Sequence, residues 1–204
     1  MRAVDDVLKF WFGVRGNDLD VLEDKSALWF SGGEEVDQQI RQEFAATLEA
    51  AGRGELNDWA HTPRGRLALI IVLDQFPRNI HRGAAQAFAY DAEAQRLCRE
   101  GVAHGDDRKL RPVERPFFYM PLMHAEELTA QDECVALFER LVAEHEGPLK
   151  ERFQHNLGFA HKHRDLIVEF GRYPYRNATL GRESTAAEVT HLASSEESFG
   201  QTKR

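Results

Sequence analysis

The sequence is poor in the features that mark membrane-spanning, disulfide-stabilised and nucleic-acid-binding proteins. Across its 204 residues, no apolar run approaches the roughly 20 residues that a membrane-spanning helix needs. Cys98 and Cys134 lack Cys-x-x-Cys spacing and sit in helical patterns, so we expect buried, reduced thiols. With 26 Lys and Arg residues against 34 Asp and Glu residues, the formal net charge of −8 opposes binding to a phosphate backbone. We therefore expect no membrane partner and no nucleic-acid partner.

Several familiar catalytic motifs are also missing. The chain contains no P-loop, no Gly-x-Gly-x-x-Gly fingerprint, no Gly-x-Ser-x-Gly elbow and no His-Glu-x-x-His pair. Nucleotide-dependent and serine-hydrolase chemistry of the common kinds therefore has no support, and we expect no cofactor. The first residues, Met1 to Asp6, carry acids where a secretory signal needs basic residues, which predicts a cytoplasmic protein.

What the sequence does contain is a helical periodicity along nearly its whole length. Val36, Ile40, Phe44 and Leu48 recur every four residues and mark one face of an amphipathic helix. Capping signals mark the ends of other helices: Thr62-Pro63, Asp91, the Thr185–Glu188 capping-box spacing and Gly171. No stretch shows period-two alternation flanked by hairpin turns. We predict an all-α fold of about eight or nine helices, stacked as antiparallel hairpins in one domain over residues 1–193, with a disordered tail over 194–204.

The most distinctive feature of the chain is a sequence motif that occurs twice in similar form. Residues 75–83 read QFPRNIHRG, and residues 172–182 read RYPYRNATLGR. Each has an aromatic-Pro pair, an Arg-Asn dipeptide, and then a Gly beside another Arg. A guanidinium group is a rigid, planar set of hydrogen-bond donors that binds a carboxylate or phosphate through two hydrogen bonds. Two such turns in an acidic protein predict one site for an anionic group.

The candidate ligand-binding residues gather around these turns. We expect four arginines to clamp the anion, Asn79 and Asn177 to orient the turns, and Tyr119 and His124 to line the pocket. The clamp consists of Arg78, Arg115, Arg172 and Arg176, and Arg82 and Arg182 complete the arginine set. A structural interpretation stays open, because an Arg just after a helix can bond the last carbonyls, and Arg78 or Arg115 can pair with Asp74 or Glu114.

Three motifs resemble those of a known protein family. They are LDQFPRN at 73–79, ER at 114–115 with FYMPLMH at 118–124, and FGRYPYRN at 170–177 with LGREST at 180–185. The chain resembles, from Val7 to Leu192, a widespread family of unknown function that is similar to tetratricopeptide-like helical proteins. The resemblance implies an all-helical, tetratricopeptide-like fold and no established activity. This chain departs from it at Tyr175, where the family often has His, and at Ala125, where it often has Ser.

The candidate acid–base residues are His124, Asp74, Glu114 and His163. His124 and Glu127 are three residues apart and share a helix face, a spacing that suits a metal-ligand pair or an acid–base pair. A firm metal site needs three or four ligands, so we predict no metal.

A second group of histidines lies on one long predicted helix. His155 and His163, with Phe159 between them, lie on about the same side of that helix. His163 falls beside an apolar stripe, which predicts that it is buried.

These observations leave three interpretations of function. In the first, which we favour, an Arg-lined cavity binds a small anionic ligand or the acidic end of a peptide. In the second, the protein is an enzyme of small substrates, in which His124 with Asp74 or Glu114 does acid–base work and the arginines hold the anion. In the third, every motif residue is structural and the function is a protein–protein surface. The oligomeric state and the identity of the ligand do not follow from the sequence.

Overall fold

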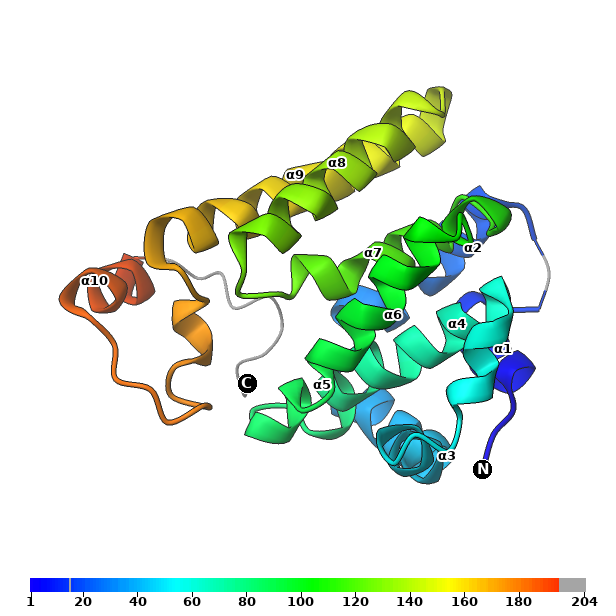
Figure 1. The fold of residues 1–204 in the computed structure, drawn as a ribbon, viewed down its shortest axis with the longest axis horizontal. Coiled ribbons are helices and arrows are strands. Elements are labelled where there is room, and N and C mark those ends of the chain that lie inside the picture. The colour runs from blue at the N-terminus through cyan, green and yellow to red at the C-terminus, as the bar shows by residue number, and fades with distance from the viewer. Residues whose placement is uncertain (15, 195–204) are drawn as a thin grey trace.

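The computed structural model describes residues 1–14 and 16–194, and its regular structure there is helical throughout (Figure 1). The first half contains α1 (Val4–Phe12), α2 (Asp18–Ser26), η1 (Ala27–Ser31), α3 (Glu34–Gly52), η2 (Asn57–His61), α4 (Pro63–Ile70), η3 (Ile71–Gln75), α5 (Phe76–Ile80) and η4 (Ala85–Phe88). The second half contains α6 (Asp91–Ala103), η5 (Asp107–Lys109), α7 (Arg115–Met123), α8 (Leu128–Ala143), α9 (Gly147–Phe170), η6 (Pro174–Arg176) and α10 (Ala186–Ser194). With the continuous run from α4 to α5 taken as one helix, the described residues form nine α-helices. The all-α prediction is confirmed, whereas the tetratricopeptide-like arrangement stays a prediction.

The run from α4 through η3 to α5 is the centre of the molecule. Every residue from 67 to 74 is almost fully buried. The run begins at Pro63, whose fixed φ suits the first helical position, and the Thr62 hydroxyl caps it by accepting from the Gly65 amide at 3.1 Å. Helices α1, α3, α6 and α7 all pack against this run. A helix that is covered in this way is apolar on every side, and residues 67–73 are all apolar.

Helices α8 and α9 form a long hairpin that packs along α7 (Figure 1). The hairpin ends at Gly171, which adopts a left-handed conformation with φ of 69° and closes α9 as a C-cap. The chain then turns back through η6 to α10. Ser194, the first residue of the predicted tail, still belongs to α10, and the rest of that tail lies outside the described residues. In the described ranges, no helix is both long and apolar enough to cross a membrane.

Helices α6 and α7 approach each other closely at Gly101. A Cβ atom at this position would lie 2.4 Å from Cζ of Phe118 and 2.5 Å from Cδ of Arg66. Phe118 is fully buried, and Arg66 is held by Asp106 at 3.1 Å. Neither side chain can therefore move away from an added Cβ atom. Gly158 in α9 is the opposite case, since nothing lies within 4 Å of its added Cβ.

This contrast predicts opposite effects of the same substitution. Gly101→Ala should lower the free energy of unfolding by about 1–3 kcal/mol, because the new methyl group overpacks the contact between α6 and α7. Gly158→Ala should raise it by up to about 1 kcal/mol, because alanine favours the helix and meets nothing. Urea unfolding of both variants measures the two changes. Equal stability of Gly101→Ala and the parent would contradict the close approach.

Candidate functional site

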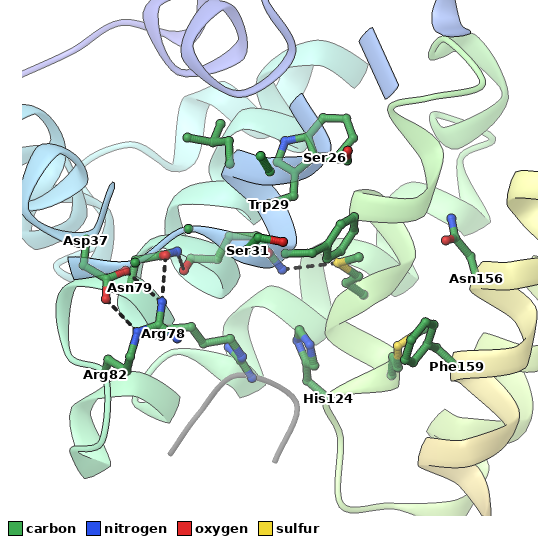
Figure 2. A pocket seen from close by; sticks show the side chains of 18 of the residues that line it. Ser26, Trp29, Ser31, Asp37, Arg78, Asn79, Arg82, His124, Asn156 and Phe159 are labelled. Atoms are coloured by element: carbon green, nitrogen blue, oxygen red, sulfur yellow. Dashed lines mark hydrogen bonds and ion pairs between the residues drawn. The ribbon is translucent and has the colours of Figure 1, made fainter. Parts of the chain in front are cut away.

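A large cavity lies between the central helices and the α8–α9 hairpin (Figure 2). Its volume is about 1130 Å³, and its walls come from η1, the start of α3, α5, the end of α7 and the hairpin. The charged lining consists of four arginines and two carboxylates: Arg41, Arg78, Arg82, Arg152, Glu34 and Asp37. The histidines and the larger apolar side chains of the lining are His124, His155, His163, Trp29, Phe30, Met120, Met123, Phe138 and Phe159.

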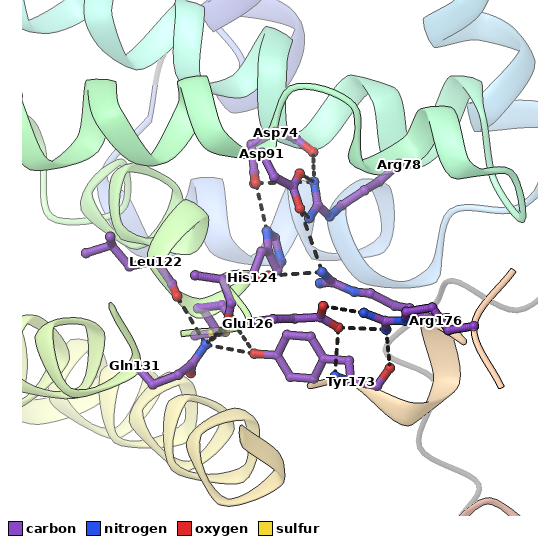
Figure 3. A network of polar contacts seen from close by, with 12 residues as sticks. Asp74, Arg78, Asp91, Leu122, His124, Glu126, Gln131, Tyr173 and Arg176 are labelled. Atoms are coloured by element: carbon purple, nitrogen blue, oxygen red, sulfur yellow. Dashed lines mark hydrogen bonds and ion pairs between the residues drawn. The ribbon is translucent and has the colours of Figure 1, made fainter. Parts of the chain in front are cut away.

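His124 and Asp74 form a hydrogen-bonded pair at the wall of this cavity (Figure 3). His124 directly follows α7, and Asp74 lies on η3, where it is fully buried. Nδ1 of His124 lies 2.8 Å from Oδ1 of Asp74. A carboxylate can only accept, so Nδ1 carries the proton and the neutral imidazole keeps its lone pair on Nε2. Among the residues that the structure describes, none hydrogen-bonds Nε2.

The surroundings of the pair keep Asp74 charged and His124 neutral. Burial alone would raise the pKa of Asp74, but the charges and hydrogen bonds of His124, Arg78 and Gln75 lower it to about 2. Gln75 donates to the second carboxylate oxygen at 2.6 Å, and Arg78 lies 3.3 Å from the first. Burial and the positive charge of Arg78 lower the pKa of His124 below its ordinary value, although Asp74 opposes them. At neutral pH the imidazole is therefore an unprotonated base beside a permanent carboxylate.

Two π-helical segments, η1 and η3, border the cavity. Such segments are rare in proteins, and single π-helical turns inside α-helices occur frequently at functional sites. Segment η3 interrupts the central run and carries both Asp74 and Gln75. Its wider turn changes the direction of these two side chains relative to an uninterrupted α-helix. The apolar pattern of residues 67–73 contains no sign of this turn, so periodicity could not reveal it.

The segment that follows α9 holds the loop that carries His124 (Figure 3). Arg176 donates to the carbonyl oxygen of His124 at 3.1 Å, and the Tyr173 hydroxyl donates to the carbonyl oxygen of the residue before it. Arg182 binds both carboxylate oxygens of Glu126, at 2.6 and 2.9 Å. The last carbonyl groups of a helix have no partner within it. Here residues 50 and 52 positions further along the chain supply those partners and fix the loop.

The two similar Arg-bearing turns meet in the structure at Asp91, the first residue of α6 (Figure 3). Arg78 binds the two carboxylate oxygens of Asp91 at 2.9 Å each, and Nη1 of Arg176 lies 3.7 Å from one of them. Both guanidinium groups also lie over the ring of Phe88, at 5.6 and 4.6 Å from its centroid. The protein's own carboxylate thus occupies the place between these arginines where the sequence predicts a bound anion.

Arg115 and Tyr119 lie outside the cavity, in a buried polar cluster beside η5. Nε of Arg115 donates to the Tyr119 hydroxyl at 3.1 Å, and the hydroxyl donates to Asp107 at 2.7 Å. Nη1 of Arg115 donates to Glu144 at 2.5 Å. Burial raises the pKa of Tyr119 to about 12. These partners give Arg115 and Tyr119 a structural role, so neither forms part of the predicted pocket.

Three further predicted residues are also bound elsewhere. Arg172 binds the two carboxylate oxygens of Glu188 at 2.6 and 2.8 Å. The side-chain amide of Asn177 donates to the hydroxyl of Ser184 at 3.0 Å. Glu114 accepts from Arg64 at 3.3 Å. Of the predicted ligand-binding residues, those that line the cavity are Arg78, Asn79 and His124.

One face of α9 supplies cavity residues that the sequence did not single out. Arg152 and Asn156 line the cavity together with His155, Phe159 and His163. Their spacing puts all five on one side of the helix. The sequence pattern put His155, Phe159 and His163 on about the same side of the helix, and the continuation of that pattern toward the start of α9 is the signal that could have identified Arg152 and Asn156.

His163 is buried in this wall, as its place beside the apolar stripe predicted. The residue is 4% exposed, and its Nδ1 donates to the carbonyl oxygen of Phe159 at 2.8 Å. Burial lowers the pKa of His163 to about 3, so its ring is neutral. The ring centroids of His163 and His124 are 6.5 Å apart. Within residues 1–14 and 16–194, no three His, Cys, Asp or Glu side chains are grouped as a metal site requires.

Comparisons with known proteins identify the family of the chain. Residues 7–196 match the model of a family described as "Bacterial protein of unknown function (DUF924)", and the chain belongs to this family. It is also similar to the solved structure of a protein of unknown function from Agrobacterium tumefaciens, with a TM-score of 0.79 and 33% sequence identity. That match covers 94% of this chain and 97% of the other. No curated protein matches the chain. The resemblance to a family of unknown function is thereby confirmed.

The buried His163 predicts how stability depends on pH. Its pKa is about 3 in the folded protein, below the ordinary value of about 6.5 in the unfolded chain, so acid favours unfolding. The free energy of unfolding should be highest above about pH 6.5 and should lose up to about 1.4 kcal/mol per pH unit below it. His163→Phe keeps an aromatic ring, cannot titrate and should remove that part of the slope. Urea unfolding of both proteins between about pH 7 and pH 5 measures the difference, and parallel slopes would contradict it.

Proposed function

We propose that this member of the DUF924 family binds a small organic anion in the cavity between its central helices and the α8–α9 hairpin. The observation that carries the proposal is the charge of the lining, where four arginines accompany two carboxylates in a chain of net charge −8. A cavity with such a local excess of positive charge concentrates anions. Its volume of about 1130 Å³ lies just above the usual range for small-molecule pockets, which is roughly 300–1000 Å³.

Arg152 and Arg41 provide the charge that is available to a ligand. The other two cavity arginines are bound to aspartates, but within the described parts of the chain neither Arg152 nor Arg41 forms an ion pair. Arg41 donates to the carbonyl oxygen of Ile80, which leaves its charge uncompensated. The guanidinium of Arg152 lies over the ring of Phe30 at 5.6 Å, and its buried Nε has no hydrogen-bond partner. A carboxylate or phosphate group would supply that partner.

The rest of the lining favours an anion with a carbon skeleton. Large apolar side chains from η1, α7 and the hairpin cover much of the wall, among them Trp29, Met123 and Phe159. The side-chain amides of Asn79 and Asn156 add polar groups at separate points. Apolar walls with a few placed polar groups are the usual design of a small-molecule site. We therefore propose that the ligand is a small organic molecule that carries a carboxylate or phosphate group.

Ligand binding should appear as thermal stabilisation that depends on Arg152. Inorganic phosphate, succinate and citrate serve as probes, because each presents the anionic group without assuming a particular skeleton. A probe at about 100 times its Kd would add about 2.7 kcal/mol to the free energy of unfolding and raise Tm accordingly. Arg152→Ala should abolish the rise for the probes that stabilise the parent, and added salt should weaken it.

Arg164→Ala is the matched control for this experiment. Arg164 lies on the same helix and binds Asp132 at 2.6 Å, outside the cavity lining. Its loss changes the net charge by the same amount and should leave the ligand-induced rise in Tm intact. The proposal is wrong if none of the probes stabilises the parent, or if the two variants respond alike.

A further inference from the structure

We infer that His124 is a general base that activates water in this cavity, that Asp74 is its positioning residue, and that the reaction is hydrolysis of a small anionic ester. The inference rests on the proposed function, because the ester has to occupy the same cavity. It goes beyond binding, since it assigns a proton-transfer step to a named atom, Nε2 of His124.

The first support is the fixed orientation of the imidazole. The 2.8 Å hydrogen bond to Asp74 sets the tautomer, so that the free lone pair is on Nε2. Asp74 is itself held by Gln75 at 2.6 Å and is fully buried, so it cannot turn away. A base whose neighbouring carboxylate fixes its ring and tautomer is the arrangement that general-base catalysis by histidine requires.

The second support is that distant parts of the chain converge on this one ring. The LDQFPRN motif supplies Asp74, and the FYMPLMH motif ends in His124. The third motif supplies Arg176, which holds the carbonyl oxygen of His124 at 3.1 Å. Side chain and backbone of the same residue are thus fixed from two directions (Figure 3). A residue with a merely space-filling role does not need both constraints.

The third support is that Nε2 of His124 has no hydrogen-bond partner among the described residues. A structural histidine in a protein interior normally has partners for both ring nitrogens, because an unpaired buried polar atom is costly. His124 lines the cavity, and no residue in the described ranges bonds its Nε2. No Ser, Thr or Cys side chain among them bonds this atom either, so no protein nucleophile is paired with the base. Water in the cavity is the group that Nε2 is placed to activate.

The charges around the ring keep the base unprotonated before reaction. The charged groups that face it are Asp74 from η3, Arg78 from α5, Asp91 from α6 and Arg176 from η6, and His163 from α9 is neutral. Two arginines balance two aspartates, so a proton on His124 would add an unbalanced positive charge. Burial and Arg78 accordingly lower the pKa of His124. The imidazole can accept a proton from water and release it again at neutral pH.

The step is chemically complete with water as the only co-reactant. Nε2 of His124 takes one proton from a water molecule while the water oxygen forms a bond to the ester carbonyl carbon. The tetrahedral intermediate then collapses, the bond from the acyl carbon to the alcohol oxygen breaks, and that oxygen takes the proton from the imidazolium. The products are a carboxylic acid and an alcohol, and His124 is again neutral. Asp74 remains a carboxylate throughout and stabilises the transient imidazolium.

Two chromogenic esters test the inference directly. They are 4-nitrophenyl acetate, which is neutral, and the monoester 4-nitrophenyl succinate, which carries a carboxylate, and release of 4-nitrophenolate reports the rate. His124→Gln should lower kcat for both esters by about 100-fold, the size of effect that a positioned general base provides. Asp74→Asn should lower kcat with little change in KM and should move the acid limb of the pH–rate profile to lower pH, because a stabilising negative charge is lost. His61→Gln is the control, since His61 is exposed and outside the cavity lining, and it should leave both rates unchanged.

The outcomes separate this inference from the binding proposal. Arg152→Ala should raise KM for the succinate monoester and leave 4-nitrophenyl acetate unaffected. If that difference is missing while His124→Gln still loses turnover, anion binding at Arg152 fails and the general base stands. The inference is overturned if His124→Gln keeps the parental rate, or if the parent cleaves neither ester faster than free imidazole at the same concentration. Should Asp74→Asn fail to fold, His124→Gln decides the question alone.

Discussion

The buried carboxylate of Asp74 is the constraint on which this part of the structure depends. An isolated charge in a protein interior is very costly, so groups from other elements have to surround it. Arg78 comes from the next helical turn, Gln75 from the neighbouring position and His124 from the end of α7. Their contacts bring the end of α7 against η3. The wall of the cavity and the orientation of the imidazole both follow from this one requirement.

The arginines of the two similar turns serve this arrangement first. Arg78 and Arg176 share Asp91 and lie over Phe88, which joins the segment after α9 to the central helices. Arg182 also joins the segment after α9 to the rest of the fold, by binding Glu126 in the loop after α7. A guanidinium group binds a carboxylate of its own chain by the same geometry that it offers to a ligand. The repeated motif of an aromatic-Pro pair and an Arg-Asn dipeptide therefore forms a junction within the chain, and the arginines that we propose to contact the ligand are Arg41 and Arg152.

The cavity joins two parts of the fold that differ in character. On one side are the central run and α7, which are buried and tightly bonded. On the other side is α9, whose polar and aromatic face includes Arg152 and His155. His124, the proposed base, therefore lies on the constrained side, and Arg152, which we propose to bind the ligand, lies on the hairpin. Under our proposal, one wall fixes the position of the reacting group and the other recognises the charge of the ligand.

The helical class and much of the local structure follow from residue type and spacing along the chain. Ile40, Phe44 and Leu48 are buried as their spacing predicts, Thr62 and Gly171 cap helices, and the Thr185–Glu188 capping box forms. These features depend on hydrogen bonds and burial within a few residues, which periodicity and residue type encode. The packing of the helices, by contrast, sets which carboxylate each arginine binds, where η3 widens the helix and which face of α9 lines the cavity. Asp74 and His124 are 50 positions apart, and Glu126 and Arg182 are 56. Their pairing follows from how whole helices pack, because side-chain charge has no preferred partner until the backbone brings two groups within a few ångströms.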